Sequence, residues 1–452
     1  MTIESVDVIV VGMGIGGEMI ANALVDGGLR VLGVDDGLIG GECAYWGCIP
    51  TKIMVRGANL LAEARRAGVG AGGVDVHALW ERVRRRVRDA TGNWDDTSAV
   101  KGFEDKGGGF IRGRAHLSAP DLVEVNGTSY RASRGIVIAT GTAPTVPNVE
   151  GLDAVPYWTN RDAVIAESRP ESIVVLGGGS VGVEFAQIWQ RFGSAVTVLE
   201  AGDRLLSHEE PEAGTLIAEV LRSEGVDVKT GVEIERVEAE AGGSVVVRTR
   251  AGETIRARQL MVAAGRSAHL RELGVGEAGL DAGAERIEVD DRLRAAPGIW
   301  AIGDVTGKGE FTHVATYQAR IAAADMLGAD TAPARYHAVP RVTFSDPEVG
   351  AVGLTESQAI ERGRDVVCTS MDLATSSRGF LHGEGGGGVI KLVFDRTGNT
   401  LIGATSVGPM GGEVLSMLAL AVHAEITSDV LKEMIYAYPT FHRAVLDALD
   451  RL

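Results

Sequence analysis

The apolar positions near the start of the chain change from one period to another. A mostly apolar run at residues 6–11 leads into a glycine-rich turn at residues 12–17, after which apolar positions recur with helical spacing as far as Val25. A second apolar run, residues 29–34, ends at Asp35. Short apolar runs joined by a helical pattern are typical of buried parallel strands with a crossover helix. The segment therefore predicts a βαβ unit.

The same order of elements recurs 165 positions later. An apolar run at residues 173–176 leads into a turn at residues 177–182, a helical pattern follows, and the strand Ala195–Leu199 ends at Glu200. One glycine-rich turn is a weak signal, whereas two copies in one register predict a duplicated unit. The matching landmarks are Gly12 and Gly177, Gly14 and Gly179, Gly17 and Gly182, and Asp35 and Glu200.

These residue types suit a dinucleotide. The first glycine of such a turn allows a tight bend, the second lets the backbone approach a pyrophosphate, and the third lets helix and strand pack closely. The helix that follows offers free N–H groups and a positive dipole to the phosphates. The acid at the end of the second strand accepts hydrogen bonds from ribose hydroxyls. The sequence therefore predicts two dinucleotide sites.

A cysteine pair follows the first unit. Cys43 and Cys48 stand five positions apart, and Pro50 and Lys52 come soon after them. Close-set cysteines are more often metal ligands or structural links, but their place beside a dinucleotide unit favours redox chemistry. Electrons pass between a flavin and a redox-active cysteine pair only when the pair lies near the flavin ring. We therefore assign FAD to the first unit and a nicotinamide cofactor to the second, and we expect no resident metal site.

The acid of the second unit bears on the choice of nicotinamide cofactor. The carboxylate of Glu200 would repel the 2′-phosphate of NADPH, which favours NADH. Arg204 lies nearby in the sequence and would offset part of that repulsion. NAD(H) is the expected cofactor, with NADP(H) as the alternative.

Composition narrows the class of protein. The formal charge is 44 − 61 = −17, which disfavours nucleic acid and anionic membranes as partners. The basic run at residues 82–88 carries Val83 and Val87 at helical spacing and predicts an amphipathic surface helix. No apolar segment is long enough to span a bilayer, and no signal peptide is expected.

The chain has three cysteines, and two of them lie in the motif described above. Such sparse use of cysteine is typical of a cytoplasmic protein, in which a disulfide is usually catalytic or transient. Cys368 lies far from the motif in sequence, and we expect it to be buried in a core.

Together these motifs resemble the pyridine nucleotide–disulfide oxidoreductases, the family of dihydrolipoamide dehydrogenase, glutathione reductase and mercuric reductase. The resemblance covers nearly the whole chain. Further matching segments are residues 138–144 (a crossing from the flavin to the nicotinamide domain), residues 264–266 (the return crossing), residues 298–304 (a second flavin motif), Thr312 with His313 (backbone near the flavin), and residues 345–356 (the start of a dimerisation domain).

The resemblance implies an α/β architecture with two Rossmann-like domains and a C-terminal mixed α/β domain. The flavin domain would occupy residues 1–147 and 265–335, split by a nicotinamide domain at 148–264, and the dimerisation domain would occupy 336–452. It also implies a homodimer in which each active site borrows C-terminal residues from the other subunit. Cofactor contacts are expected from residues that match the family's motifs: Lys52, Ala115, Thr140, Gly141, Gly265, Arg266, Asp304, Thr312 and His313.

The resemblance also assigns roles around the cysteines. Cys48 would lie against the flavin ring and Cys43 would exchange with a small-molecule disulfide. A helix is expected to begin around residues 49–50, and a helix N-terminus favours the reactive thiolate. Lys52 matches a family lysine beside the flavin, and Glu184 matches its carboxylate partner, since buried charges of this kind need to be paired.

Near the C-terminus the chain departs from the family pattern. Disulfide reductases carry a histidine followed five positions later by a glutamate, whereas this chain has Tyr438 and Arg443 at those positions. Tyrosine is a poor base at neutral pH, because its unperturbed pKa is about 10. General base catalysis of a dithiol would then be weaker by about a hundredfold or more. His442 is expected to be structural rather than a replacement base.

The missing histidine keeps a second function open, the reduction of a soft metal ion, a quinone or another electron acceptor. Mercuric reductases also have tyrosine at this position, but they end in a cysteine pair, whereas this chain ends in residues 448–452 without one, and no cysteine-bearing metal-binding domain is expected before residue 1. Trp46, beside the outer thiol, would narrow the approach or stack on a flat substrate. A non-catalytic flavin subunit or redox sensor is disfavoured, because the cofactor motifs are complete.

Overall fold

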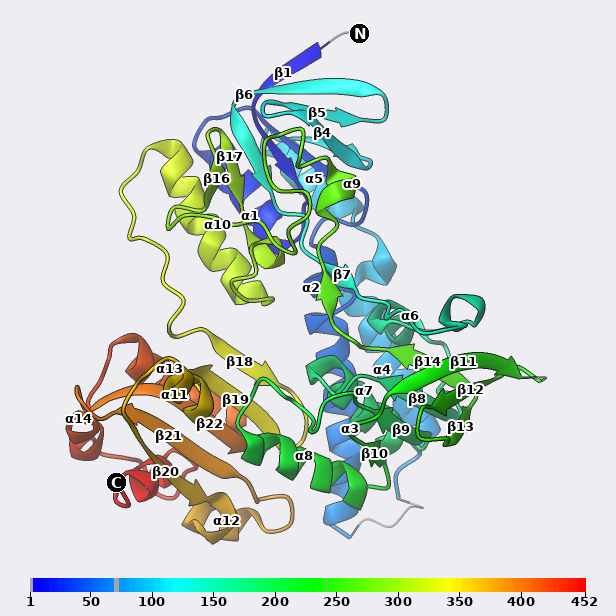
Figure 1. Cartoon of the computed structure of the whole chain (residues 1–452), viewed down its shortest axis with the longest axis vertical. Coiled ribbons are helices and arrows are strands. Elements are labelled where there is room, and N and C mark those ends of the chain that lie inside the picture. Colours follow the sequence, from blue (N-terminus) through cyan, green and yellow to red (C-terminus); the bar gives the residue numbers. More distant parts are fainter. Residues whose placement is uncertain (1–2, 69–72, 241) are drawn as a thin grey trace. The chain divides into compact units, whose positions relative to one another are not determined.

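The computed structural model describes residues 3–68, 73–240 and 242–452. By its internal contacts the chain divides into two units, each made of three segments (Figure 1). Unit 1 contains Met1–Thr51, Arg85–Pro144 and Arg266–Tyr336. Unit 2 contains Lys52–Arg84, Thr145–Gly265 and His337–Leu452.

Unit 1 is built on an eight-stranded sheet whose main path runs in the order β16-β17-β6-β1-β2-β3, with β5 pairing β6 and β4 pairing β5. Strands β17, β6, β1, β2 and β3 are parallel. Residues 8–11 of β1, 31–34 of β2 and 135–138 of β6 are buried on both faces, which explains the continuous apolar runs in the sequence. The strands are β1 (Ile3–Val11), β2 (Val31–Asp35), β3 (Gly109–Arg112), β4 (Ala115–Ala119), β5 (Leu122–Val125), β6 (Thr128–Ile138), β16 (Arg294–Ala296) and β17 (Ile299–Ala301).

Helix α1 follows β1, and α10 packs beside it on the same sheet (Figure 1). Ile20 and Leu24 of α1 share one core cluster with Ala319 and Ala322 of α10 and with Val8 and Val10 of the sheet. The helices of unit 1 are α1 (Ile15–Asp26), α2 (Gly41–Tyr45), α5 (Thr97–Asp105), α9 (Leu270–Leu273) and α10 (Thr312–Leu327), with short 3₁₀ turns η1 (Gly92–Trp94) and η3 (Gly303–Thr306).

Two helices belong to both units. Helix α3 (Cys48–Arg66) begins in unit 1 and continues in unit 2, and α4 (Val76–Ala90) begins in unit 2 and ends in unit 1. Val83 and Val87 of α4 are buried while several of its arginines are exposed, so the predicted amphipathic helix is confirmed. The helix expected around residues 49–50 is confirmed as well and begins at Cys48.

Unit 2 contains a second parallel sheet, in the order β10-β9-β8-β14. A three-stranded antiparallel sheet, β11-β12-β13, shares an apolar core with it. The elements of this part are η2 (Leu152–Ala154), α6 (Asn160–Ile165), β8 (Ser172–Leu176), α7 (Ser180–Arg191), β9 (Ala195–Leu199), α8 (Pro211–Ser223), β10 (Asp227–Lys229), β11 (Ile234–Glu240), β12 (Ser244–Thr249), β13 (Thr254–Ala257) and β14 (Gln259–Val262). Both predicted βαβ units are therefore present, β1-α1-β2 and β8-α7-β9.

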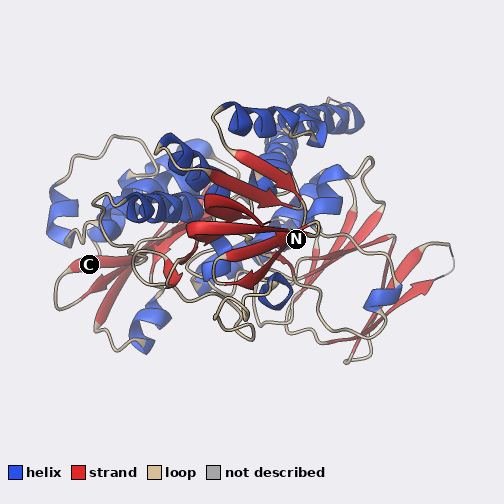
Figure 2. Cartoon of the chain, turned by 90° about the horizontal axis from the view of Figure 1, so that it is seen from above, coloured by secondary structure: helices blue, strands red, loops and turns tan. Residues whose placement is uncertain are grey.

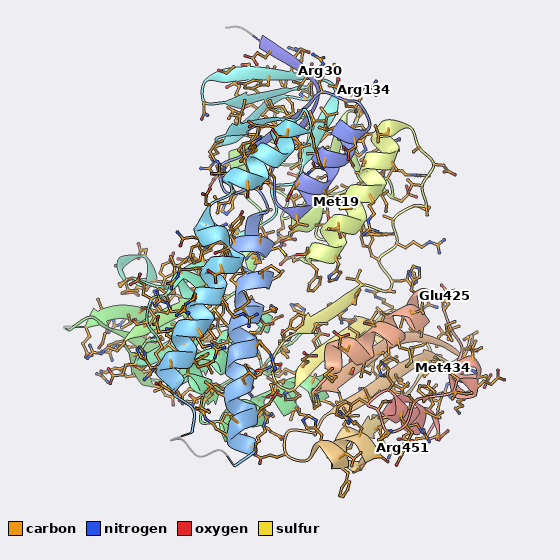
Figure 3. The ribbon with its side chains drawn as sticks, turned by 180° about the vertical axis from the view of Figure 1, so that it is seen from behind. Met19, Arg30, Arg134, Glu425, Met434 and Arg451 are labelled. Carbon is orange, nitrogen blue, oxygen red and sulfur yellow. The ribbon has the colours of Figure 1, made fainter. Side chains whose placement is uncertain are left out.

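The C-terminal part of unit 2 is a five-stranded antiparallel sheet in the order β18-β19-β22-β21-β20, with helices packed against it (Figures 1 and 2). Glu425 and Met434, labelled in Figure 3, lie just after α13 and α14 of this part. The elements are β18 (Pro340–Thr343), β19 (Glu348–Gly353), α11 (Glu356–Glu361), β20 (Val366–Asp372), η4 (Leu373–Thr375), α12 (Ser377–His382), β21 (Val389–Asp395), β22 (Thr400–Gly408), α13 (Gly411–His423), α14 (Ser428–Glu433) and α15 (Arg443–Leu449).

The two segments predicted to be crossings pair with each other. Strand β7 (Ala143–Pro144) pairs antiparallel with β15 (Arg266–Ser267). On the next residues along, Thr145 N donates to Gly265 O at 2.9 Å. The chain therefore leaves unit 1 and returns to it through two adjacent extended segments.

Candidate functional site

The glycines of the first turn are required by its geometry. Gly12 has φ +94°, and a Cβ there would lie 2.4 Å from Ala139 O. A Cβ on Gly17 would lie 1.8 Å from Gly12 O, so helix α1 packs too closely for any side chain. Gly14 has open space where its Cβ would be, as expected where backbone must approach a ligand.

The second turn repeats these constraints. Gly177 has φ +112°, and its Cβ would lie 2.3 Å from Ala263 O. A Cβ on Gly182 would lie 2.0 Å from Gly177 O, whereas the Cβ position of Gly179 is open. The two turns thus leave backbone N–H groups at the start of α1 and α7 accessible to a pyrophosphate.

The two acids are held in equivalent positions. Asp35 accepts hydrogen bonds from Met13 N at 2.5 Å and Gly37 N at 2.7 Å. Glu200 accepts from Gly178 N at 2.5 Å and Gly202 N at 2.6 Å. Burial raises the pKa of Asp35, against the opposing effect of the Met13 N–H. Each carboxylate keeps lone pairs for the hydroxyls of a ribose.

Arg204, which was expected to offset part of the repulsion between Glu200 and a 2′-phosphate, is hydrogen-bonded to its own loop. Its guanidinium donates to three backbone oxygens: Leu206 O at 3.2 Å, Ser207 O at 2.7 Å and Glu209 O at 2.9 Å. A guanidinium has five donors in a fixed fork, so these bonds fix its orientation. Turning the guanidinium toward a phosphate would break these hydrogen bonds to the loop.

The crossing segments bring together three polar residues of unit 1. Arg266 donates from Nε to Thr142 Oγ1 at 2.8 Å and from Nη2 to Thr142 O at 2.6 Å. Thr142 Oγ1 in turn donates to Asp304 Oδ2 at 3.0 Å. Burial raises the pKa of Asp304. The structure thus joins two expected cofactor residues, Arg266 and Asp304, through Thr142, which the sequence did not single out.

The other expected cofactor residues differ in their surroundings. Gly141 and Gly265 have φ of +62° and +106° and open Cβ positions, and Thr140, next to Gly141 in the chain, is exposed. Ala115, by contrast, opens strand β4 with its side chain in the core, so only its backbone faces outward contacts.

The Cys48 thiol lies where two helices begin. Cys48 is the first residue of α3 and Thr312 is the first residue of α10, and Cys48 Sγ lies 3.4 Å from Thr312 Oγ1. Helix N-termini stabilise negative charge, so this arrangement favours a thiolate. Cys43 lies on α2 with intermediate exposure, and His313 stacks on Phe311 with ring centroids 5.1 Å apart.

Within unit 2, Lys52 and Glu184 form the expected ion pair. Lys52 Nζ lies 2.8 Å from Glu184 Oε2, and Glu184 is only 5% exposed. Glu184 Oε1 accepts from Phe344 N at 2.9 Å, and the ammonium lies 4.9 Å from the Phe344 ring centroid. Because Lys52 is one turn along α3 from Cys48, the pair fixes the rotation of the helix that carries the inner thiol.

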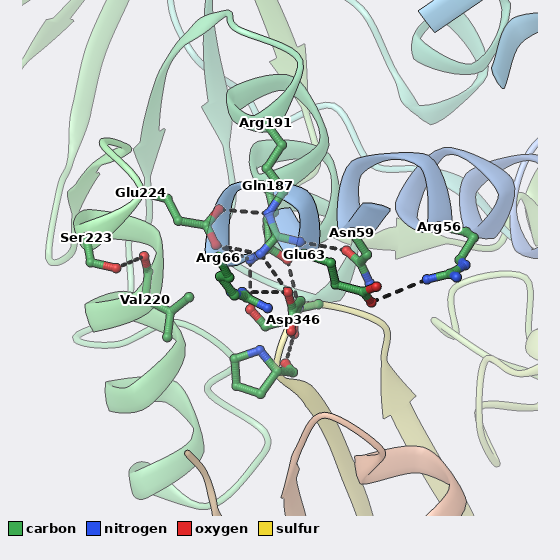
Figure 4. A network of polar contacts seen from close by, with 12 residues as sticks. Arg56, Asn59, Glu63, Arg66, Gln187, Arg191, Val220, Ser223, Glu224 and Asp346 are labelled. Carbon is green, nitrogen blue, oxygen red and sulfur yellow. Dashed lines mark hydrogen bonds and ion pairs between the residues drawn. The ribbon is translucent and has the colours of Figure 1, made fainter. Parts of the chain in front are cut away.

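Glu184 lies on helix α7. Two further side chains of this helix, Gln187 and Arg191, bind the segment before β19 (Figure 4). Gln187 exchanges hydrogen bonds with the backbone of Asp346 at 2.8 and 2.9 Å. Arg191, 1% exposed, binds both oxygens of Glu224, Asp346 Oδ2 at 2.9 Å and Asn59 Oδ1 at 2.7 Å. Arg66 binds the same Asp346 oxygen at 2.8 Å. This network links α3, α7 and α8 to the C-terminal sheet.

The structure adds an aromatic partner to Trp46. Trp94 stacks on it with centroids 5.9 Å apart and planes inclined by 25°, and Trp94 Nε1 donates to Tyr45 O at 3.2 Å. No local pattern joins these two tryptophans, which come from the end of α2 and from η1. Trp46 is therefore held on one side by the fold of unit 1.

The departures near the C-terminus have new partners. Tyr438, 71% exposed, donates from Oη to Ser377 Oγ at 3.1 Å. Arg443 pairs with Asp447, one helical turn along α15, at 2.8 Å. His442 occupies the N-cap position of α15, but its side chain makes no capping hydrogen bond. No side-chain contact within the described residues places it beside Tyr438.

Cys368 is half-buried on β20, so the expectation of a buried core residue is wrong. Its strand neighbours the polar cluster of Lys391, Glu210, Glu212 and Glu356, which the apolar context of the sequence did not reveal. Desolvation, and then the charge of Glu356, raise its pKa to about 12.

Cys368 should therefore alkylate slowly. With its pKa at about 12, its thiolate fraction near neutral pH is roughly a thousandfold smaller than that of an ordinary exposed thiol, and thiolate is the reactive form. Iodoacetamide labelling followed by peptide mass spectrometry measures this rate, with the urea-unfolded protein as control. Equal rates in folded and unfolded protein would contradict the prediction.

Membrane spans and metal clusters are both absent from the described residues. No helix in the described part of the chain is both long and apolar enough to cross a bilayer. No three or more histidine, cysteine or acidic side chains gather as a metal site within residues 3–68, 73–240 and 242–452.

Comparisons with known proteins agree with this geometry. Residues 6–319 match the pyridine nucleotide-disulphide oxidoreductases, and residues 339–449 match the dimerisation domain of the same family. Mercuric reductase from Streptomyces lividans is 32% identical over 97% of this chain and 94% of its own length. Dihydrolipoyl dehydrogenase from Chlorobaculum tepidum is 32% identical over 98% of this chain and 96% of its own.

Solved structures show the same fold. The HOCl-induced flavoprotein disulfide reductase RclA from Escherichia coli, in its Cu(II) complex, superposes with a TM-score of 0.86 at 26% identity and covers 98% of this chain and 99% of its own. The dimerisation-domain match supports a homodimer. By these matches the chain belongs to the pyridine nucleotide-disulphide oxidoreductase family and is an FAD-dependent NAD(P)H oxidoreductase.

Proposed function

We propose that this protein uses NADH to reduce a small-molecule disulfide through Cys43 and Cys48. The balanced reaction is NADH + H⁺ + RSSR → NAD⁺ + 2 RSH, and it can run in reverse. The observation that carries the proposal is the 3.4 Å contact of Cys48 Sγ with Thr312 Oγ1 at the start of α10, in the unit that holds the first glycine turn.

The residues present fit FAD in unit 1. The open Cβ position of Gly14 leaves room for a pyrophosphate, Gly12 and Gly17 shape the turn, and Asp35 would accept from the ribose. Asp304 and Arg266 would hold the far part of the cofactor, together with Thr140, Gly141, Gly265, Ala115, Thr312 and His313. When bound, FAD would supply two-electron transfer between the nicotinamide and the cysteine pair.

The chain's own groups would divide the thiol chemistry. Cys48, at a helix start, would keep the sulfur nearest the flavin as a thiolate. Cys43, on the separate short helix α2, would attack the substrate disulfide and release one thiol. Lys52 and Glu184 would position α3, since the buried carboxylate holds the ammonium and Phe344 N together.

The domain ranges proposed are 1–147 and 265–335 for FAD, 148–264 for the nicotinamide, and 336–452 for dimerisation. The division into two units changes at Thr145, Arg266 and His337, close to these limits. It also changes at Lys52 and Arg85, within the first FAD range, and it keeps the proposed nicotinamide and dimerisation domains in one unit. Gly177, Gly179, Gly182 and Glu200 would hold the nicotinamide dinucleotide. We place the protein in the cytoplasm on its sparse cysteines.

NADH should be preferred over NADPH by about tenfold or more in kcat/KM, because like charge opposes a 2′-phosphate and Arg204 is engaged elsewhere. Replacing Glu200→Ser should lower the ratio of kcat/KM for NADH to kcat/KM for NADPH by about tenfold. Steady-state kinetics with both cofactors measure it, and Glu171→Ser, an exposed acid of unit 2, serves as control. An unchanged ratio in Glu200→Ser would contradict this assignment.

A second function, reduction of a soft metal ion or a quinone, is favoured by Tyr438 and by the relatives named mercuric reductase. The hydroxyl of Tyr438 binds Ser377 and has no histidine–carboxylate pair around it in the described residues. Electron acceptors of this kind need no acid or base for a leaving thiol.

An acceptor panel separates the two functions. Under anaerobic conditions with NADH, disulfides should be reduced faster than Hg(II) or menadione. Tyr438→His should raise dithiol turnover, because imidazole is the better base near neutral pH. If no disulfide is reduced and only the metal ion or quinone is, the second function replaces the first.

A further inference from the structure

A small cavity of about 70 Å³ lies between α12, the segment before α15 and α15 itself. Its lining includes Ser377, Arg378, Tyr438, Arg443 and Asp447. The volume is several times the roughly 15 Å³ that one water requires, so a group of a few heavy atoms fits. None of the cofactor contacts proposed above uses it.

The polar groups of this cavity are mainly donors. Arg378 stacks on Phe441 at 5.7 Å, and its guanidinium has no carboxylate partner among the described residues. Arg443 Nη1 lies 2.8 Å from Asp447 Oδ1. Two guanidinium groups against one carboxylate leave the lining with a charge of +1, in a chain whose formal charge is −17.

The hydroxyl groups of the cavity add to this excess of hydrogen-bond donors over acceptors. Ser377 Oγ accepts from Tyr438 Oη, so the proton of Ser377 is left to donate elsewhere. Thr440 Oγ1 already donates to Ala437 O at 2.7 Å, and Ser376 Oγ already donates to Leu373 O at 2.6 Å. The cavity therefore offers guanidinium N–H groups and one serine hydroxyl to an acceptor, and its sole carboxylate among the described residues is already paired.

We propose that this cavity is an anion subsite that binds a carboxylate of the substrate. A planar carboxylate matches the fork of a guanidinium, and charge-assisted bonds of this kind are the strong ones. The proposal rests on the proposed function and on the homodimer that the family resemblance implies, in which C-terminal residues of one subunit complete the active site of the other. The positions at which the family has its histidine and glutamate would thus serve recognition here, and the preferred disulfide is an acidic one.

Two aromatic disulfides test the subsite by kinetics. Wild type should reduce 5,5′-dithiobis(2-nitrobenzoate), a dicarboxylate, with about tenfold higher kcat/KM than neutral 4,4′-dithiodipyridine. Arg378→Gln and Arg443→Gln should remove most of that advantage by raising KM for the dicarboxylate. Both variants should leave kcat/KM for the neutral disulfide within about twofold. The dependence of dicarboxylate reduction on salt concentration should become weaker. Arg378→Lys should restore part of it, and Arg396→Gln, an exposed arginine just after β21, is the control.

Binding is measured separately from turnover. Saturation-transfer NMR with benzoate, and with benzamide as its neutral isostere, should show benzoate alone bound to wild type and lost in Arg378→Gln. The subsite proposal would be overturned if kcat/KM fell equally for both disulfides in the variants. It would also be overturned if Arg378→Gln still bound benzoate. If neither disulfide is reduced while benzoate binds as expected, the proposed function fails and the anion site stands.

Discussion

Replacing Cys43→Ser should lower disulfide reduction by at least about a thousandfold, because the nucleophile that attacks the substrate is removed. Binding of FAD should survive, since Cys43 lies on α2 and none of the glycine, Asp35 or Asp304 contacts depends on it. Visible absorbance of the purified variant measures FAD content, and anaerobic turnover with NADH measures activity.

The third cysteine supplies the matched control. Cys368→Ser changes a thiol on β20, outside unit 1, and should keep full activity. Reduction of an outer-sphere acceptor such as ferricyanide should persist in Cys43→Ser, because electrons need not pass through the outer thiol. Full disulfide turnover in Cys43→Ser would remove the central role of the pair.

Arg191→Met should be the most destabilising single change, by about 3–5 kcal/mol in the free energy of unfolding. The variant leaves Glu224 and Asp346 without the buried guanidinium that binds both, and Asn59 loses a donor (Figure 4). Chemical denaturation followed by tryptophan fluorescence gives the midpoint, which should fall without a change in slope if unfolding stays cooperative.

An exposed ion pair is the control for Arg191. Arg30, labelled in Figure 3, pairs with Asp7 at 3.2 Å with 66% of its side chain exposed, and Arg30→Ala should cost less than about 1 kcal/mol. Glu224→Gln should be intermediate, since Asp346 still binds Arg191. If Arg30→Ala and Arg191→Met lost comparable free energy of unfolding, the buried network would contribute no more to stability than an exposed ion pair, and the prediction would be contradicted.

The order of strands, turns and helices in both βαβ units could be predicted from local sequence. Gly12, Gly17, Gly177 and Gly182 have no room for a side chain, so a fixed residue type at fixed spacing reports a backbone geometry. The predicted ends of elements also lie close to the observed ends. Helix α3, for example, was expected to begin around residues 49–50 and begins at Cys48. The exception was Cys368, whose polar surroundings come from residues distant in sequence.

The two dinucleotide units and the cysteine pair could be predicted from the chain alone, because each depends on short spacing or on a motif with one geometric solution. The pairing of Lys52 with Glu184, 132 positions apart, was expected only from the family resemblance. Other contacts became known only from the three-dimensional structure. Thr142 joins Arg266 to Asp304, and Arg204 is hydrogen-bonded to its own loop. Arg378, Arg443 and Tyr438 line one cavity. These partners are brought together by chain crossings and by packing of separate helices. No local pattern of hydrophobic and polar residues encodes which distant side chains will meet.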